Sequence, residues 1–120
     1  MRFFCISKSD AKTEAGVPPS QDVLATCGTY VEEQLKSGAL LATEALYPSS
    51  KAARLRVCQG KLTVTDGPFA EAKEVIASYA LIQVKSKEEA IERVAGFLKI
   101  FGDGEADIYQ VYDAGDFSPA

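Results

Sequence analysis

Residues 75–84, VIASYALIQV, are the stretch that decides the fold of this 120-residue chain. Side chains of a β-strand point alternately to its two faces, and here both alternating sets are mostly apolar. A strand with one face in water would alternate cleanly between apolar and polar residues. We therefore expect residues 75–84 to form a long strand that is covered on both faces. Residues 3–7, FFCIS, are apolar on both faces as well and predict a second strand.

Two amphipathic helices are predicted on either side of the long strand. Residues 21–36 follow Ser20, a good N-cap, carry apolar residues at three- and four-residue spacing, and stop at Gly38. A second helix follows the capping box of Ser86 and Glu89 and ends at Gly102. Its spacing directs one apolar face toward the core, formed by Ala90, Ile91, Val94, Phe97, Leu98 and Phe101.

The remaining segments are predicted to be a loop over residues 8–19, strands over 40–47 and 108–112, and a hairpin over 53–65. The hairpin turns about Gln59 and Gly60, which pairs residue 57 with 62 and residue 55 with 64. This register places Leu55, Val57, Leu62 and Val64 on one face, and Arg54, Arg56, Thr63 and Thr65 on the other.

The order of elements predicts an α+β fold. Strand, helix, strand, inserted hairpin, strand, helix and strand form a ferredoxin-like βαββαβ unit, with both helices on one face of an antiparallel sheet. Residues 1–113 make this single domain, and residues 114–120 are a polar tail. Because two helices cannot cover both faces, we expect a second copy of the chain to pack against the open face as a homodimer.

Composition excludes several classes of function. The chain has 13 basic and 17 acidic residues and a net charge of −4, with no basic stripe, so nucleic acid is not an expected partner. Without histidine it has no Ser-His-Asp or Cys-His nucleophile and no histidine zinc site. Its apolar runs are shorter than the roughly 20 residues of a membrane span, and it begins with no signal-peptide core. We expect a cytoplasmic protein with no membrane contact.

The three cysteines point away from disulfides and metals. Cys5, Cys27 and Cys58 are odd in number, far apart in the sequence and without a Cys-x-x-Cys pair. This pattern favours reduced thiols that are mostly buried. With neither histidine nor a cysteine cluster, the sequence predicts no metal and no other cofactor.

The most specific motif follows the hairpin, where residues 64–74 read VTDGPFAEAKE. Gly67 precedes a proline, Asp66 can accept hydrogen bonds from the backbone of the turn, and Pro68 directs Phe69 onto the core. The stretch resembles the signature of the YCII-related family, specifically its DGPF subgroup. The resemblance covers nearly the whole chain, since similar segments occur at residues 38–41 (GALL), 46–50 (LYPSS), 81–84 (LIQV) and 86–91 (SKEEAI).

The resemblance implies a fold more than a chemistry. Members of the YCII-related family are small proteins of the dimeric α+β barrel type. Some relatives are regarded as enzymes because they resemble muconolactone-isomerase-type barrels, and others are linked by gene neighbourhood to extracytoplasmic-function sigma factors. The family likeness therefore implies either small-molecule chemistry or a role near transcription.

Three positions depart from the family pattern. Tyr47 stands where relatives often carry histidine before Pro-Ser-Ser, Ala80 stands where they often carry tryptophan, and Tyr109 stands where they often carry arginine. If a family activity uses that histidine as a base, this chain must use Tyr47 or Asp66 instead, or lacks the activity.

The candidate site gathers around the hairpin and its exit turn. Asp66 and Tyr47 are candidate proton-transfer groups, and the candidate substrate-binding residues are Arg54, Arg56, Phe69, Glu71 and Tyr79. Each also has a purely structural interpretation. Asp66 can serve its own turn, the arginines can form a solvated face paired with Glu44 or Glu71, and the tyrosines can be core residues.

The convergence of these groups predicts an apolar cleft between sheet and helices that binds a small anionic metabolite. In such a cleft, burial raises the pKa of a carboxyl group, as proton abstraction next to a carbonyl requires. The expected activity is an isomerase or lyase-like reaction without a cofactor. The alternatives are a non-catalytic ligand-binding or regulatory module, for which the resemblance implies a link to sigma-factor-dependent transcription, and a structural dimer whose cleft is vestigial.

Overall fold

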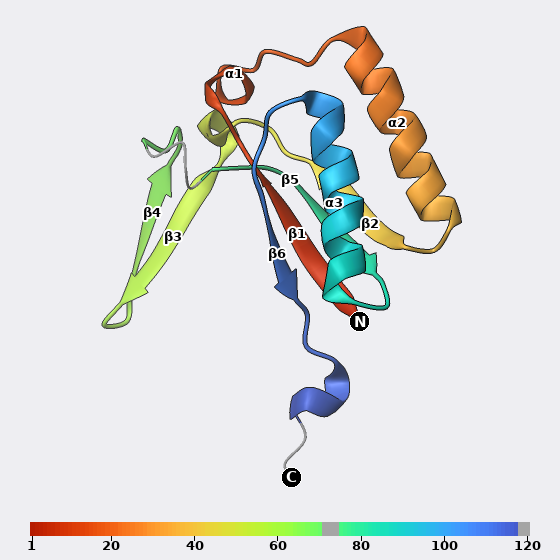
Figure 1. Cartoon of the computed structure of the whole chain (residues 1–120). Helices are drawn as coiled ribbons and strands as arrows, with labels where there is room; N and C mark the ends of the chain where they lie inside the picture. The colour runs from red at the N-terminus through yellow and green to blue at the C-terminus, as the bar shows by residue number, and fades with distance from the viewer. Residues whose placement is uncertain (71–74, 118–120) are drawn as a thin grey trace.

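A four-stranded antiparallel sheet is the centre of the computed structural model, which describes residues 1–70 and 75–117 (Figure 1). Its strands run in the order β2-β5-β1-β6. The βαββαβ unit is built from β1 (Arg2–Lys8), α2 (Gln21–Lys36), β2 (Leu40–Ala45), β5 (Ile76–Gln83), α3 (Lys87–Phe101) and β6 (Ala106–Gln110). The predicted ferredoxin-like α+β fold is confirmed.

Helices α2 and α3 cover one face of this sheet (Figure 1). The core lies between these two layers and consists of Phe3, Cys5, Leu40, Ile82, Val84 and Ala90. Among the described residues no large side chain is completely buried. The single chain therefore has a thin core. Hydrophobic burial stabilises this chain less than it stabilises a compact domain of the same length.

Both helices begin at the caps that the sequence predicts. The Ser20 hydroxyl accepts a hydrogen bond from the Val23 N–H at 3.2 Å, and the Ser86 hydroxyl accepts one from the Glu89 N–H at 3.1 Å. The Glu89 carboxylate in turn accepts the Lys85 N–H at 2.9 Å, and this backbone hydrogen bond lowers the pKa of Glu89. Helix α2 has the predicted bounds, residues 21–36, because its start and stop signals are local.

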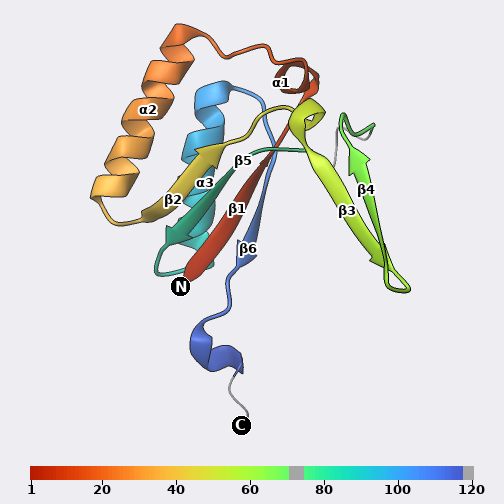
Figure 2. The same cartoon turned by 180° about the vertical axis from the view of Figure 1, so that it is seen from behind.

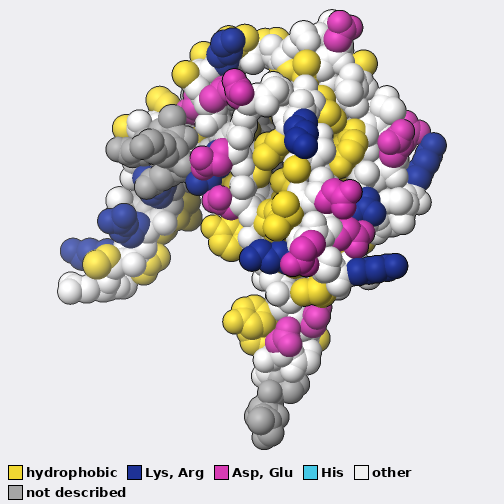
Figure 3. Space-filling model, viewed as in Figure 1, with side chains coloured by type: hydrophobic (Ala, Val, Ile, Leu, Met, Phe, Trp, Pro, Cys, Tyr) yellow, Lys and Arg dark blue, Asp and Glu magenta, His cyan; other side chains and the backbone are white. Residues whose placement is uncertain are grey.

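The inserted hairpin has the predicted register and stands away from the sheet. Strands β3 (Ala53–Cys58) and β4 (Lys61–Asp66) form their own two-stranded sheet, and Leu55 lies opposite Val64. Gln59 and Gly60 have φ values of 51° and 79°, the left-handed pair that a tight two-residue hairpin turn requires. Figure 3 shows the hairpin as a projecting arm that carries basic and apolar side chains.

The second face of the sheet has no helix over it (Figure 2). The strand register places Phe4, Ile6, Tyr79 and Leu81 on this face, which we call the open face. The Phe4 and Tyr79 rings stack there with centroids 5.6 Å apart. Within the single chain, these side chains are only half-buried, which agrees with the prediction that β5 is apolar on both faces.

The structure corrects several local predictions. A short helix, α1 (Ala11–Glu14), interrupts the predicted loop because Asp10 accepts a hydrogen bond from the Thr13 N–H and caps it. Ile91 is exposed because it lies about 100° around the helix from the buried Ala90. Phe101 is also partly exposed, at the last residue of α3.

The ends of the strands and one thiol also differ from expectation. The last strand begins two residues earlier than predicted and ends at Gln110. Cys58 is exposed at the tip of the hairpin rather than buried, although all three cysteines are free. A short 3-10 helix, η3 (Ala114–Phe117), begins the polar tail. No helix within the described ranges is long and apolar enough to cross a membrane.

Candidate functional site

A cleft of about 380 Å³ lies where the hairpin leaves the sheet. Its walls are formed by the segment after β2 with the 3-10 helix η1 (Ser49–Lys51), by the start of β3, by Phe69 after β4, and by the start of β5. Its volume falls in the range of small-molecule sites. The lining residues are Leu46, Tyr47, Pro48, Ser49, Lys51, Ala52, Arg54, Phe69, Val75 and Ile76.

Ser49 holds the walls of this cleft together. It is the one buried polar residue in the described part of the chain, with 3% of its surface exposed. Its N–H and hydroxyl donate to the two carboxylate oxygens of Glu14 at 2.8 and 2.5 Å. The same hydroxyl accepts the Phe69 N–H at 3.0 Å. Both hydrogen bonds lower the pKa of Glu14, the one from the Ser49 hydroxyl more than the one from its N–H, so this carboxylate stays ionised.

Gly67 brings the exit turn against η1. Its N–H donates to the Ala52 carbonyl at 2.9 Å, and a Cβ at this position would lie 1.6 Å from the Ser49 carbonyl oxygen. Only glycine fits this approach of two backbones. The sequence predicted a demanding position at Gly67, and the structure supplies the reason, which is close packing against a residue 18 positions earlier.

Two cations face the cleft, each beside an aromatic ring. The Lys51 ammonium lies 5.2 Å from the centroid of the Tyr47 ring, and the Arg54 guanidinium carbon lies 4.3 Å from the centroid of the Phe69 ring. Such cation–π contacts orient a charged group while leaving its donors free. None of the lining residues within 1–70 and 75–117 is acidic. The arrangement is suited to a small anion with a flat apolar part.

The structure brings only some of the predicted site residues together. Tyr47, Arg54 and Phe69 line the cleft, although it lies beside the hairpin and not between sheet and helices as predicted. Arg56 lies two residues further out along β3, and Asp66 is an exposed residue at the end of β4. Neither of them belongs to the lining. Glu71 lies outside the described residues.

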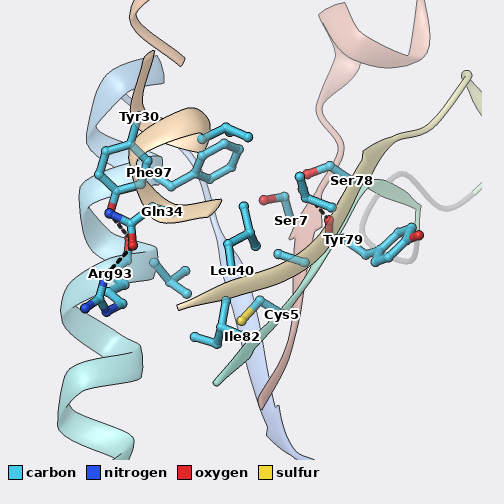
Figure 4. A pocket seen from close by; sticks show the side chains of 14 residues that line it. Cys5, Ser7, Tyr30, Gln34, Leu40, Ser78, Tyr79, Ile82, Arg93 and Phe97 are labelled. Carbon is cyan, nitrogen blue, oxygen red and sulfur yellow. Dashed lines mark hydrogen bonds between the residues drawn. The ribbon is translucent and has the colours of Figure 1, made fainter. Parts of the chain in front are cut away.

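A second, smaller cavity does lie between the sheet and the helices, and Figure 4 shows its lining side chains. Tyr79 is among the residues that line this cavity, but its ring points away from the cavity in Figure 4 and stacks on Phe4. The Tyr79 ring therefore belongs to the open face, and its role in substrate binding stays a prediction.

Sequence reasoning missed Glu14, Ser49 and Lys51. Ser49 lies in the LYPSS segment, but there the sequence pattern singled out Tyr47, which replaces a histidine. Glu14 lies in a polar stretch with no motif, and it meets Ser49 across 35 residues. No side-chain group of three His, Cys, Asp or Glu that could hold a metal ion occurs in residues 1–70 or 75–117.

Comparison with known proteins gives a family and a fold. The chain is 39% identical over 72 residues to an uncharacterised protein of Rhizobium meliloti (strain 1021), and the match covers 60% of this chain and 55% of that protein. A solved structure, 5-chloro-2-hydroxyhydroquinone dehydrochlorinase (TftG) from Burkholderia phenoliruptrix AC1100 in complex with 2,5-dihydroxybenzoquinone, aligns over 97% of this chain and 98% of its own. Its TM-score is 0.55 at 14% sequence identity, so this likeness concerns the fold alone. The model of the YCII-related domain matches residues 1–114, and the chain therefore belongs to the YCII-related domain family.

Proposed function

We propose that the cleft at the base of the hairpin binds a small planar anion. The observation that carries this proposal is the pair of cations, Lys51 and Arg54, beside the rings of Tyr47 and Phe69 in the cleft. Guanidinium groups bind carboxylates and other planar oxyanions through paired hydrogen bonds. An apolar wall for the uncharged part of the ligand is supplied by Leu46, Val75 and Ile76, which lie just after β2 and at the start of β5.

The ligand class agrees with what the similar fold binds. The dehydrochlorinase of similar fold holds 2,5-dihydroxybenzoquinone, a flat ring that carries hydroxyl and carbonyl groups. For this chain the corresponding class is a ring or short conjugated chain that carries a carboxylate or an ionised enol. The proposal for this ligand class depends on the cations of the cleft, because the sequence identity to that relative is too low to transfer a substrate.

The chemistry we propose is proton transfer without a cofactor. A base removes a proton from the carbon next to the ligand carbonyl, the electron pair moves onto the carbonyl oxygen as an enolate, and a proton returns at another carbon to give an isomer. Arg54 and Lys51 stabilise the enolate charge. Among the lining residues, Tyr47 is the group that takes up the proton and returns it.

One observation favours a second candidate function, binding without catalysis. Glu14, the carboxylate bonded to the cleft wall, is occupied by two hydrogen bonds from Ser49, which lower its pKa and make it a poor base. A cleft that holds an anion, with no carboxylate among the lining residues that the structure describes, is suited to a ligand-binding or regulatory module. Such a module includes the sigma-factor-linked role that the family resemblance implies.

The matched arginines of β3 provide the test. Arg54 lines the cleft and Arg56 does not, yet both lie on the same face of the same strand. Small carboxylates and hydroxyquinones are screened by thermal shift against the wild-type protein, Arg54→Gln and Arg56→Gln. We expect a ligand that stabilises the wild-type protein and Arg56→Gln but not Arg54→Gln. Equal stabilisation of both variants would refute the cleft as the binding site.

Catalysis is then tested with the ligand that binds. Proton abstraction exchanges a carbon-bound hydrogen for solvent deuterium, which proton NMR detects. We expect exchange with the wild-type protein that is slowed at least tenfold in Tyr47→Phe. Binding without any exchange would favour the ligand-binding module.

We also propose that two copies pack through their open faces. The radius of gyration is 16.6 Å, whereas a compact domain of this length has about 14 Å. Phe4, Ile6, Tyr79 and Leu81 lie half-buried on the uncovered face of the sheet. A second copy presents the same apolar face and covers it with two-fold symmetry.

The dimer is tested by sedimentation equilibrium. We expect a dimer at micromolar concentration for the wild-type protein and for Ile91→Glu, whose parent side chain is exposed on α3. Leu81→Glu on the open face is expected to be monomeric. A monomeric wild-type protein, or a dimer that survives Leu81→Glu, would contradict this packing.

Assignment to the DGPF subgroup is likewise our proposal. It is supported by the VTDGPFAEAKE stretch at residues 64–74 and by the packing of Gly67, at which a side chain would overlap the backbone of Ser49. This close contact accounts for the glycine of the motif, whatever the ligand of the cleft.

A further inference from the structure

The cavity between the sheet and the helices is separate from the cleft and has its own chemistry. Its volume is about 60 Å³, and its walls are mostly apolar side chains from both layers, among them Cys5, Leu40, Ile82, Val94 and Phe97. A single water occupies about 10–15 Å³ on this scale, so the cavity has room for roughly four to six water-sized groups. This room holds no more than one small ring.

Two serine hydroxyls lie at the sheet side of this cavity. Ser7 on β1 and Ser78 on β5 are direct partners in the strand register and share the helix-facing side with the Cys5 and Ala80 pair. Neither hydroxyl has a hydrogen-bond partner within residues 1–70 and 75–117. Every fully buried polar side-chain atom in those ranges does have a partner, so the two serine hydroxyls are not fully buried. Both hydroxyls are therefore open to a molecule that enters the cavity.

The polar groups on the helix side are already paired with each other. The Tyr30 hydroxyl donates to the Arg93 carbonyl at 2.6 Å, and the Arg93 guanidinium donates to Gln34 and lies 3.1 Å from a carboxylate oxygen of Glu89. Figure 4 shows this group across the cavity from the two serines. The charge of Arg93 is thus compensated, and a charged ligand gains no partner here.

We propose that this cavity binds a small neutral ring with a single hydroxyl group, a molecule of the phenol class. The ring lies among the apolar walls, and its hydroxyl group exchanges hydrogen bonds with Ser7 and Ser78. This places the polar end of the ligand at the sheet and its apolar end toward Phe97. The site differs from the anion cleft in both location and ligand charge.

The experiment is an NMR titration of the ¹⁵N-labelled full chain with phenol and with benzene as the matched ligand without a hydroxyl. We expect shifts at the amides around Ser7, Ser78 and Phe97, and a lower Kd for phenol than for benzene. Replacing both serines, as Ser7→Ala with Ser78→Ala, is expected to raise the Kd for phenol about fivefold and leave that for benzene unchanged. The control is Ser50→Ala, which removes an exposed hydroxyl outside the cavity lining.

The wild-type comparison stands even if the double variant fails to fold. Benzene binding as tightly as phenol, absence of binding at millimolar concentration, or shifts confined to the cleft residues Tyr47 and Arg54 would each overturn the proposal. A double variant that folds and keeps the wild-type Kd for phenol would also overturn it. Loss of anion binding in Arg54→Gln leaves this result unaffected, because Arg54 does not line the cavity.

Discussion

Gly67→Ala is expected to destabilise the protein strongly. The added Cβ would lie 1.6 Å from the Ser49 carbonyl oxygen and 2.7 Å from its carbonyl carbon. The Cβ and the oxygen would have to move apart by about 1.4 Å, from 1.6 to 3.0 Å, to reach the shortest contacts that real Cβ atoms make. Because both sides of the overlap are close to the backbone, no side-chain rotation relieves it.

A displacement of that size breaks the hydrogen bonds that close the turn. These are the 2.9 Å bond from the Gly67 N–H to the Ala52 carbonyl and the 3.0 Å bond from the Phe69 N–H to the Ser49 hydroxyl. Each lost bond costs about 1 kcal/mol, and a buried partner left unsatisfied costs about 1–3 kcal/mol. We expect the free energy of unfolding to fall by about 2–4 kcal/mol, which lowers Tm by roughly 8–16 °C in a domain of this size.

Urea unfolding followed by circular dichroism, at one fixed protein concentration, measures this loss. The matched control is Gly28→Ala in α2, where nothing lies within 4 Å of the added Cβ. Replacing a glycine within a helix by alanine is expected to stabilise the protein by about 0.5–1 kcal/mol. If Gly67→Ala unfolds at the same urea concentration as the wild-type protein, the packing argument for the turn is wrong.

Phe69→Ala is expected to cost about 2 kcal/mol, less than a fully buried ring because Phe69 is half-buried, whereas exposed Asp66 tolerates Asp66→Asn within about 0.5 kcal/mol. Urea unfolding compares the two, and the reverse order would contradict the placement of both side chains. The serine hydroxyl bonded to Glu14 lowers its pKa below the ordinary value of 4.5, so its stabilisation is complete above that pH and is lost as the pH falls through the folded-state pKa. The Tm of the wild-type protein should therefore fall more steeply than that of Glu14→Gln between about pH 5 and pH 3, and parallel profiles would refute this linkage. Cys58 should react with a thiol reagent before Cys5, because Cys5 is buried and burial raises the pKa of its thiol to about 11; mass spectrometry of the labelled peptides reads the order, and equal rates would exclude the assigned burial.

Local signals in the sequence account for most of the secondary structure. Ser20 and Ser86 cap their helices as predicted, because an N-cap acts on backbone groups two or three residues away. The hairpin register follows from Gln59 and Gly60, because a two-residue turn determines which residues lie opposite each other. The apolar character of both faces of β5 is also visible in the sequence, since the side chains of a strand point alternately to its two faces.

Contacts between distant segments were decided by the tertiary structure. The bond between Glu14 and Ser49 joins residues 35 positions apart, and neither residue type nor spacing marks it in advance. The same holds for the placement of Arg54 in the cleft and Arg56 outside it, since both share one hairpin face in the sequence pattern. Periodicity determines the face on which a side chain lies, but the cleft depends on how far along the strand the neighbouring segments approach. One such approach is the close packing of Gly67 against Ser49, a contact between two backbones that only the assembled fold creates.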